Sequence, residues 1–135
     1  MMYLTRREHF CASHRLFNPK YSDEKNVGIY GKCAWPNGHG HNYELEVTVS
    51  GTPDAGTGMI MDLKRLADIM DAEIVERVDH RHLNHDVDFL KNVIPTAENL
   101  ALVFWKILEK KIRPGKLYSV RIYETPDNYA EYRGE

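Results

Sequence analysis

The chain has 135 residues, of which 42% are hydrophobic and 28% charged, with a formal net charge of −2. This composition predicts one globular domain over residues 1–135, large enough to bury a core. Acidic and basic residues are mixed along the chain, so the basic patch typical of nucleic-acid-binding proteins is absent. No apolar run approaches the roughly 20 residues that span a bilayer, and no secretory signal precedes the first charged residues. We therefore expect a cytoplasmic protein that binds neither membranes nor nucleic acid.

The first half of the chain contains two segments with a period of two, typical of strands. Residues 3–14 form the first. Residues 40–50 form the second, with one apolar face made of Tyr43, Leu45, Val47 and Val49. Residues 18–37 between them are rich in Lys, Asp, Asn and Gly and are expected to form a long loop. Loops of this length in compact domains are usually functional or mobile.

The second half predicts two helices followed by two strands. Asp62 and Thr96 are expected N-caps, each followed by apolar residues at helical spacing: Leu63, Leu66, Ala67, Met70 and Ile74, then Leu100, Val103, Phe104, Ile107 and Leu108. Pro114–Gly115 should end the second helix, and residues 117–123 and 128–133 read as strands joined by a turn. This order predicts an α+β domain in which two helices cover one face of a four-stranded antiparallel sheet.

The segment Cys33–Tyr43 reads Cys-Ala-Trp-Pro-Asn-Gly-His-Gly-His-Asn-Tyr. If His39 and His41 lie on a strand, their side chains share one face and their Cα atoms lie roughly 6.5 Å apart. Two imidazoles at this separation can bind one metal ion. The alternative is a pair of surface histidines near a turn.

A third imidazole comes from the end of the first predicted strand. His14 shares its face with Phe10 and Ala12, just as His41 shares its face with an apolar stripe. Three imidazoles directed into a core without a metal would be costly. Three around Zn²⁺ leave the fourth position that catalytic zinc keeps open. Zinc is therefore the favoured interpretation, although His14 alone would be read as a core histidine.

Other candidate residues are less distinctive when taken alone. Asp79–His80, expected in a turn and followed by His82 and His85, would suit a solvated polar loop, and His82 and His85 stay unassigned. Glu124 continues the apolar face of its strand, where a carboxylate needs a partner. Cys33 is either an inert thiol or a base. A Cys11–Cys33 disulfide is a further alternative, but thiol chemistry at Cys33 favours a reducing compartment.

Together these motifs carry a family resemblance over nearly the whole chain. Phe10–Leu16, Cys33–Tyr43, Asp79–His80, Thr96–Asn99 and Tyr123–Thr125 occur in the order seen in the 6-pyruvoyl-tetrahydropterin synthase family. The resemblance implies a tunnelling fold, in which subunit sheets join edge to edge into a barrel. It further implies a homohexamer of two stacked trimers, with active sites at subunit boundaries.

The resemblance also implies roles for individual residues. The zinc ligands would be His14, His39 and His41. The catalytic group would be Cys33, Asp79 and His80, with Cys33 as general base and the other two moving protons, contributed by another subunit. The pterin would be bound by Glu124, together with Thr96 and Glu98. The implied reaction converts 7,8-dihydroneopterin triphosphate to 6-pyruvoyl-tetrahydropterin with elimination of triphosphate, a lyase step of tetrahydrobiopterin biosynthesis.

Alternatives within and outside this family differ in testable ways. Five residues separate Cys33 from His39, as in the tetrahydrobiopterin enzymes, whereas the related 6-carboxy-tetrahydropterin synthases of queuosine synthesis usually have three. Cys11, Trp35 and Ala97 depart from the family's usual residues and bear on specificity rather than on reaction class. A non-catalytic zinc- or pterin-binding oligomer is the other alternative. A metal-dependent amidohydrolase is excluded by length, because that barrel needs about 250 residues.

Overall fold

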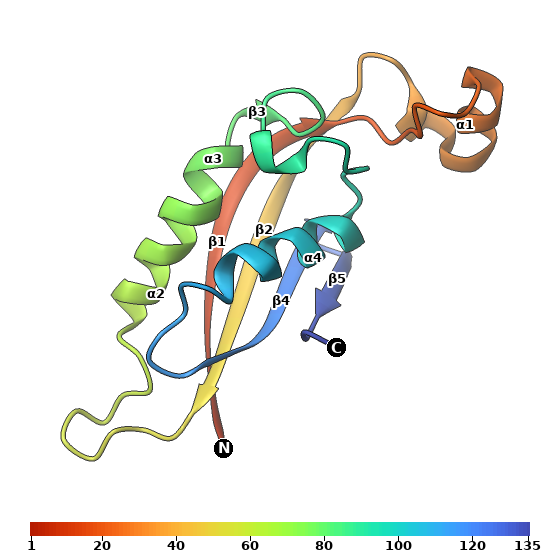
Figure 1. Cartoon of the computed structure of the whole chain (residues 1–135). Coiled ribbons are helices and arrows are strands. Elements are labelled where there is room, and N and C mark those ends of the chain that lie inside the picture. Colours follow the sequence, from red (N-terminus) through yellow and green to blue (C-terminus); the bar gives the residue numbers. More distant parts are fainter.

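The computed structural model describes all 135 residues and contains a mixed five-stranded sheet with helices on one face (Figure 1). The strand order is β3-β1-β2-β4-β5. The elements in chain order are β1 (Met2–His14), α1 (Asp23–Tyr30), β2 (His39–Gly51), α2 (Leu63–Met70), α3 (Glu76–Val78), β3 (Arg81–His82), α4 (Ala97–Leu108), β4 (Lys116–Thr125) and β5 (Asn128–Tyr132). None of the helices is long and apolar enough to cross a membrane.

The four long strands are the ones that periodicity predicts, and they pair antiparallel. The predicted α+β class is therefore confirmed. The sheet nevertheless has a fifth strand, β3, which pairs parallel to β1 at only two positions, Ala12 and Ser13. Two residues carry no periodic signal, so the sequence could not reveal this strand.

Two helical segments differ from expectation. Residues 18–37 are not a continuous loop, because α1 and a 3₁₀ turn over Gly31–Ala34 lie within them. Ser22 caps α1 by accepting a hydrogen bond from Lys25 N at 3.1 Å. The only buried residue of α1 is Asn26, so this helix has no apolar stripe for a sequence analysis to detect. The helix expected after Asp62 is interrupted by a π-helical turn over Asp71–Val75.

Both predicted N-caps are confirmed. Asp62 accepts a hydrogen bond from Lys64 N at 3.0 Å and Thr96 from Asn99 N at 3.2 Å. Each bond satisfies an N–H that has no partner inside its helix. The predicted end of the second helix is too late, because α4 stops at Leu108, before Pro114.

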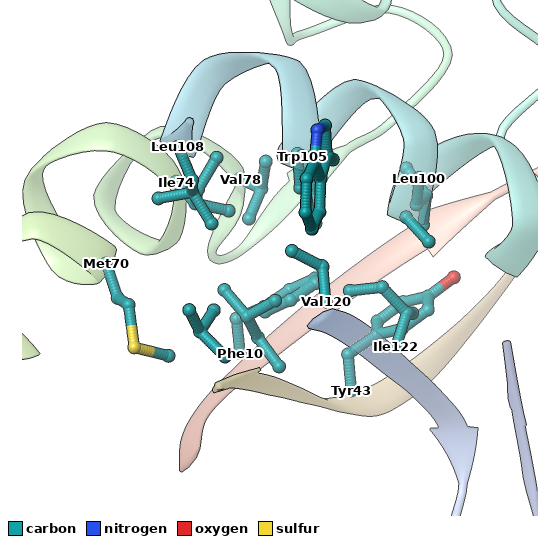
Figure 2. Close-up of a cluster of buried hydrophobic side chains, with 14 of the residues drawn as sticks. Phe10, Tyr43, Met70, Ile74, Val78, Leu100, Trp105, Leu108, Val120 and Ile122 are labelled. Carbon is teal, nitrogen blue, oxygen red and sulfur yellow. The ribbon is translucent and has the colours of Figure 1, made fainter. Parts of the chain in front are cut away.

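The core lies between the sheet and the helices α2, α3 and α4. Figure 2 shows Trp105 of α4 above Val120 and Ile122 of β4, with Phe10 of β1 and Tyr43 of β2 beside them. The rings of Phe10 and Tyr43 stack with centroids 4.8 Å apart. This packing fixes the register of β1 against β2, and that register places the residues of the candidate site.

Candidate metal centre and active site

The pairing of β1 with β2 brings the three predicted imidazoles to one end of the sheet. His14 lies opposite His39, and Ala12 lies opposite His41, two residue pairs further along the strands. Side chains of residues two apart on a strand point to the same face. His14 is fully buried, and His39 and His41 are partly buried. The strands therefore set the mutual positions of the imidazoles before any ligand binds.

Glu124, from the end of β4, completes this cluster. His41 Nε2 lies 3.0 Å and His14 Nε2 lies 3.6 Å from Glu124 Oε1. His14 Nε2 and His39 Nε2 are 3.1 Å apart. One nitrogen or oxygen from each of the four residues lies within 4.8 Å of the others. This group can bind a metal ion, because imidazole nitrogens and a carboxylate oxygen are the ligands that zinc accepts.

The hydrogen bonding of His14 fits a metal ligand. Its Nδ1 lies 2.8 Å from the carbonyl oxygen of Pro95 and 3.1 Å from the hydroxyl of Tyr43. A carbonyl oxygen only accepts, so Nδ1 carries the proton. That leaves the lone pair of Nε2 directed at the cluster. Such an outer hydrogen bond is typical of metal-binding histidines, because it fixes the tautomer and the ring orientation.

His41 supplies a second indication that a cation belongs here. Its Nε2 is buried and makes no hydrogen bond, even though Glu124 Oε1 lies 3.0 Å away. An unsatisfied polar atom at a buried position is costly. A metal ion among the four side chains would satisfy this nitrogen and would account for the close approach of the two Nε2 atoms of His14 and His39.

The charge state of the cluster also suits a cation. Burial lowers the pKa of His41, and burial together with nearby His14 lowers the pKa of His39. Interaction with His14, and then with the other two imidazoles when they are protonated, holds the pKa of Glu124 below its ordinary value. At neutral pH, His39 and His41 are therefore neutral and the carboxylate is ionised. These are the protonation states that bind metal.

Two of the three predicted pterin-binding residues share a pocket. Glu124 and Glu98 line an open pocket of about 490 Å³ beside β5, together with Ala97, Asn128, Tyr129, Ala130 and Glu131. Thr96 does not line it, and its hydroxyl caps α4 instead. Glu124 therefore faces both the imidazoles and this pocket. The sequence indicates only that Glu124 shares a strand face with Val120 and Ile122, and its role in pterin binding is implied by the family resemblance.

Cys33 lies in the 3₁₀ turn that follows α1. Its carbonyl oxygen accepts a hydrogen bond from Leu16 N at 2.8 Å, which holds the turn beside the chain just after His14. The Cys33 thiol is half-buried and the Cys11 thiol is exposed. Both are free, so the two cysteines form no disulfide. The sulfur of Cys33 is not part of the four-residue cluster.

Asp79 and His80 form a hydrogen-bonded pair in a turn, as expected. Asp79 accepts a hydrogen bond from Cys11 N at 2.9 Å and lies 3.0 Å from His80 Nδ1. The Cys11 N–H is the main cause of a lowered pKa at Asp79. The pair sits on the outer edge of β1, and the His80 side chain is 82% exposed. Neither residue makes a hydrogen bond or ion pair with Cys33 within one chain.

Several residues near the site were not assigned from the sequence. The sequence shows Tyr43 only as part of an apolar stripe, and the carbonyl of Pro95 has no sequence signature. His82 and His85 stack with ring centroids 4.4 Å apart, and His82 Nδ1 accepts a hydrogen bond from Asn84 N at 3.2 Å. Trp35 is 57% exposed next to the Cys33 turn.

Comparison with known proteins gives a consistent result. The family model described as 6-pyruvoyl tetrahydropterin synthase matches residues 3–135. A human relative named 6-pyruvoyl tetrahydrobiopterin synthase is 46% identical over 132 residues, which is 98% of this chain and 91% of the relative. A putative 6-carboxy-5,6,7,8-tetrahydropterin synthase from Archaeoglobus fulgidus is 38% identical and covers 84% of this chain and 89% of its own length.

The solved structure of 6-pyruvoyl tetrahydropterin synthase from Caenorhabditis elegans superposes with a TM-score of 0.93 at 39% identity. The match covers 99% of this chain and 96% of that one. The predicted tunnelling fold is thus confirmed for the subunit. The chain belongs to the 6-pyruvoyl tetrahydropterin synthase family.

Proposed function

We propose that the protein is a zinc-dependent 6-pyruvoyl-tetrahydropterin synthase. It would convert 7,8-dihydroneopterin triphosphate to 6-pyruvoyl-tetrahydropterin and triphosphate, a step of tetrahydrobiopterin biosynthesis. The observation that carries this proposal is the cluster of His14, His39, His41 and Glu124 in a chain that is 46% identical to a human relative named for this activity. Both thiols are free, which supports a reducing compartment such as the cytoplasm.

The three imidazoles would hold the zinc ion, and His14 would be the best-oriented ligand because of its bond to the Pro95 carbonyl. Bound zinc supplies a Lewis acid that makes protons next to coordinated oxygens more acidic. Glu124 would bind the pterin ring, whose 2-amino and N3–H groups are two donors for one carboxylate. Its place in the pocket with Glu98 supports this assignment.

The closeness of Glu124 to the imidazoles raises a second possibility, that it is the fourth metal ligand. Glu124→Gln separates the two roles because glutamine keeps the shape but loses the negative charge. If Glu124 anchors the pterin, KM should rise while the zinc content stays the same. If it is a ligand, zinc affinity should fall together with activity. Zinc titration with a chromogenic chelator, alongside steady-state kinetics, would distinguish them.

Cys33 would take a proton from the substrate side chain, and His80 would carry protons to or from it. The contact with Asp79 supports this role, because a proton on His80 Nδ1 would be held by the carboxylate and would leave Nε2 free for transfer. Since the pair lies on the outer edge of β1, apart from Cys33, we propose that a second copy of the chain brings them together.

The sheet edges support assembly of several copies. β3 pairs with the outer edge of β1 only at Ala12 and Ser13, so most of that edge has no strand partner, and β5 forms the opposite edge of the sheet. Open edges of long strands are ready templates for pairing with another chain. Edge-to-edge pairing would give the proposed trimers, two of which would stack into a homohexamer.

The function is tested by identifying products with mass spectrometry after the zinc-loaded protein has reacted with 7,8-dihydroneopterin triphosphate. We expect 6-pyruvoyl-tetrahydropterin and free triphosphate from the wild type and from Cys11→Ala, and neither from Cys33→Ala. A 6-carboxy product would place the protein in the queuosine branch of the family and contradict the inference from the Cys33–His39 spacing. No turnover with zinc bound would leave a zinc- or pterin-binding protein.

A further inference from the structure

The 3₁₀ turn that carries Cys33 is tied to the end of β1 by two hydrogen bonds. One joins two backbone groups, Leu16 N and Cys33 O, at 2.8 Å. The other runs from Arg15 Nε to the carbonyl oxygen of Ala34, also at 2.8 Å. Only the second depends on a side chain. Arg15 directly follows the buried His14, so this bond joins the Cys33 turn to the strand that supplies a ligand of the metal cluster.

Few other contacts hold the Cys33 turn and the helix before it, so these two hydrogen bonds matter for the position of Cys33. Figure 1 shows α1, which leads into the turn, lying beyond the end of the sheet and apart from the other helices. Asn26 is the only buried residue of α1, and its apolar side chains Val27 and Ile29 are 47% and 54% exposed. Ala34 is the one buried residue of the turn itself. Within one chain, apolar packing therefore holds this segment at few points, and polar contacts contribute to where Cys33 lies.

Arg15 is itself held in place by two neighbouring residues, Asn84 and Phe17. Asn84 accepts a hydrogen bond from Arg15 N at 2.8 Å and donates one to Arg15 O at 2.9 Å. The guanidinium lies 3.9 Å above the ring of Phe17. The side chain is only 17% exposed. A planar group stacked on a ring and bonded at one edge has a defined orientation. The guanidinium of Arg15 is therefore held so that its Nε points at the carbonyl oxygen of Ala34.

We propose that Arg15 is a positioning residue, which fixes the Cys33 turn relative to the metal cluster and acts on the reaction only through Cys33. The inference rests on the proposed function in taking Cys33 as the proton acceptor. Misplacing a reacting group by about 1 Å can lower a rate by about a hundredfold. The metal ligands come from the strands and do not depend on the Arg15 side chain.

The test compares Arg15→Gln with a matched control, Arg65→Gln. Arg65 also donates from Nε to a backbone carbonyl, that of Arg113, at 2.7 Å, but it lies on an exposed part of α2. For Arg15→Gln we expect kcat to fall by about 10- to 100-fold, with KM, zinc content and thermal midpoint close to those of the wild type. Arg15→Lys should recover much of the loss, because its ammonium can donate to the same carbonyl. The control should keep its kcat.

Hydrogen exchange followed by mass spectrometry gives a readout that does not require turnover. Peptides covering residues 23–36 should exchange faster in Arg15→Gln than in the wild type or in Arg65→Gln. Unchanged exchange there, an unchanged kcat, or a loss of zinc together with activity would each overturn the proposal. If the wild type made a different product, the proposed function would fail while the exchange result would still decide the role of Arg15.

Discussion

The histidine cluster and the Cys33 turn lie near the same end of β1 but are built in opposite ways. His14, His39 and His41 occupy two paired strands, so the register of the sheet fixes them. Cys33 occupies a short turn after a helix with a single buried residue. The chain therefore places the candidate metal centre on paired strands, which form the more rigid of the two regions. It leaves the proposed base to a few polar contacts and, we propose, to a neighbouring copy.

Replacing His14 should have the largest effect, because it removes a fully buried proposed ligand from the rigid region. For His14→Ala we expect loss of zinc and a fall in kcat/KM of at least about a thousandfold, equivalent to about 4 kcal/mol. Metal analysis of the purified variant and steady-state kinetics check this. Zinc bound at the wild-type level would show that the cluster is not the metal centre.

Replacing Cys33 should remove activity and leave the rigid region intact. A general base contributes about 10²- to 10⁴-fold to a rate, so kcat of Cys33→Ala should fall by that factor with zinc content unchanged. Cys11→Ala is the matched control, because Cys11 is the other free thiol and is exposed on β1. If the two variants behaved alike, Cys33 would have no special role.

Gly38 lies between Cys33 and His39 in the chain and so links the two regions. Replacing it should have a smaller effect, on stability and on zinc binding. It has a φ of +71°, and a Cβ at this position would lie 2.7 Å from the carbonyl oxygen of His14. Gly38→Ala should therefore lower the free energy of unfolding by about 1–3 kcal/mol and weaken zinc binding. Gly28→Ala in α1 is the control, since a Cβ there meets nothing within 4 Å. Chemical denaturation of both variants measures the difference, and equal stabilities would contradict the clash.

Asp71 lies outside both regions and should give the smallest effect. Burial, and then the nearby Glu8 carboxylate, raise its pKa above the ordinary 3.8. The folded protein thus holds this proton more tightly than the unfolded chain does. Protonated Asp71 therefore contributes to the free energy of unfolding. This contribution is fully present below pH 3.8 and is lost as the pH rises through the pKa of Asp71 in the folded protein.

Asp71→Asn should therefore raise the thermal midpoint at pH 7, by at most about 2 °C, with no change in zinc content or kcat. The advantage should shrink as the pH falls toward 4. Thermal unfolding of wild type and variant across this pH range checks the sign, and an advantage that grew on acidification would contradict it.

Much of the rigid region could be predicted from the sequence. Periodicity of two predicts that His14 and His41 lie on the core side of their strands, and the same argument puts Glu124 on the apolar face of its own strand. Capping residues located the starts of α2 and α4. These features are local, so a short window of sequence contains them.

The rest depends on contacts between distant segments, which no local pattern records. The Pro95 carbonyl that orients His14 is a backbone group 81 positions away. The amide of Asn84 that holds Arg15 is 69 positions away. β3 is too short for a periodic signal, and α1 has no apolar stripe. The close approach of Glu124 to the imidazoles was likewise not foreseen, because parity gives a face and not a distance.

The central claim is that one copy supplies the metal cluster and Cys33 while another supplies Asp79 and His80. Mixing two variants that are inactive on their own is the most direct test of this claim. Cys33→Ala and His80→Ala, each inactive alone, are unfolded, combined, refolded with zinc and assayed for formation of the 6-pyruvoyl product. We predict that the mixture regains activity, because some sites receive an intact Cys33 from one copy and an intact His80 from the next. A mixture that stays inactive, while wild type treated in the same way recovers, would contradict the claim.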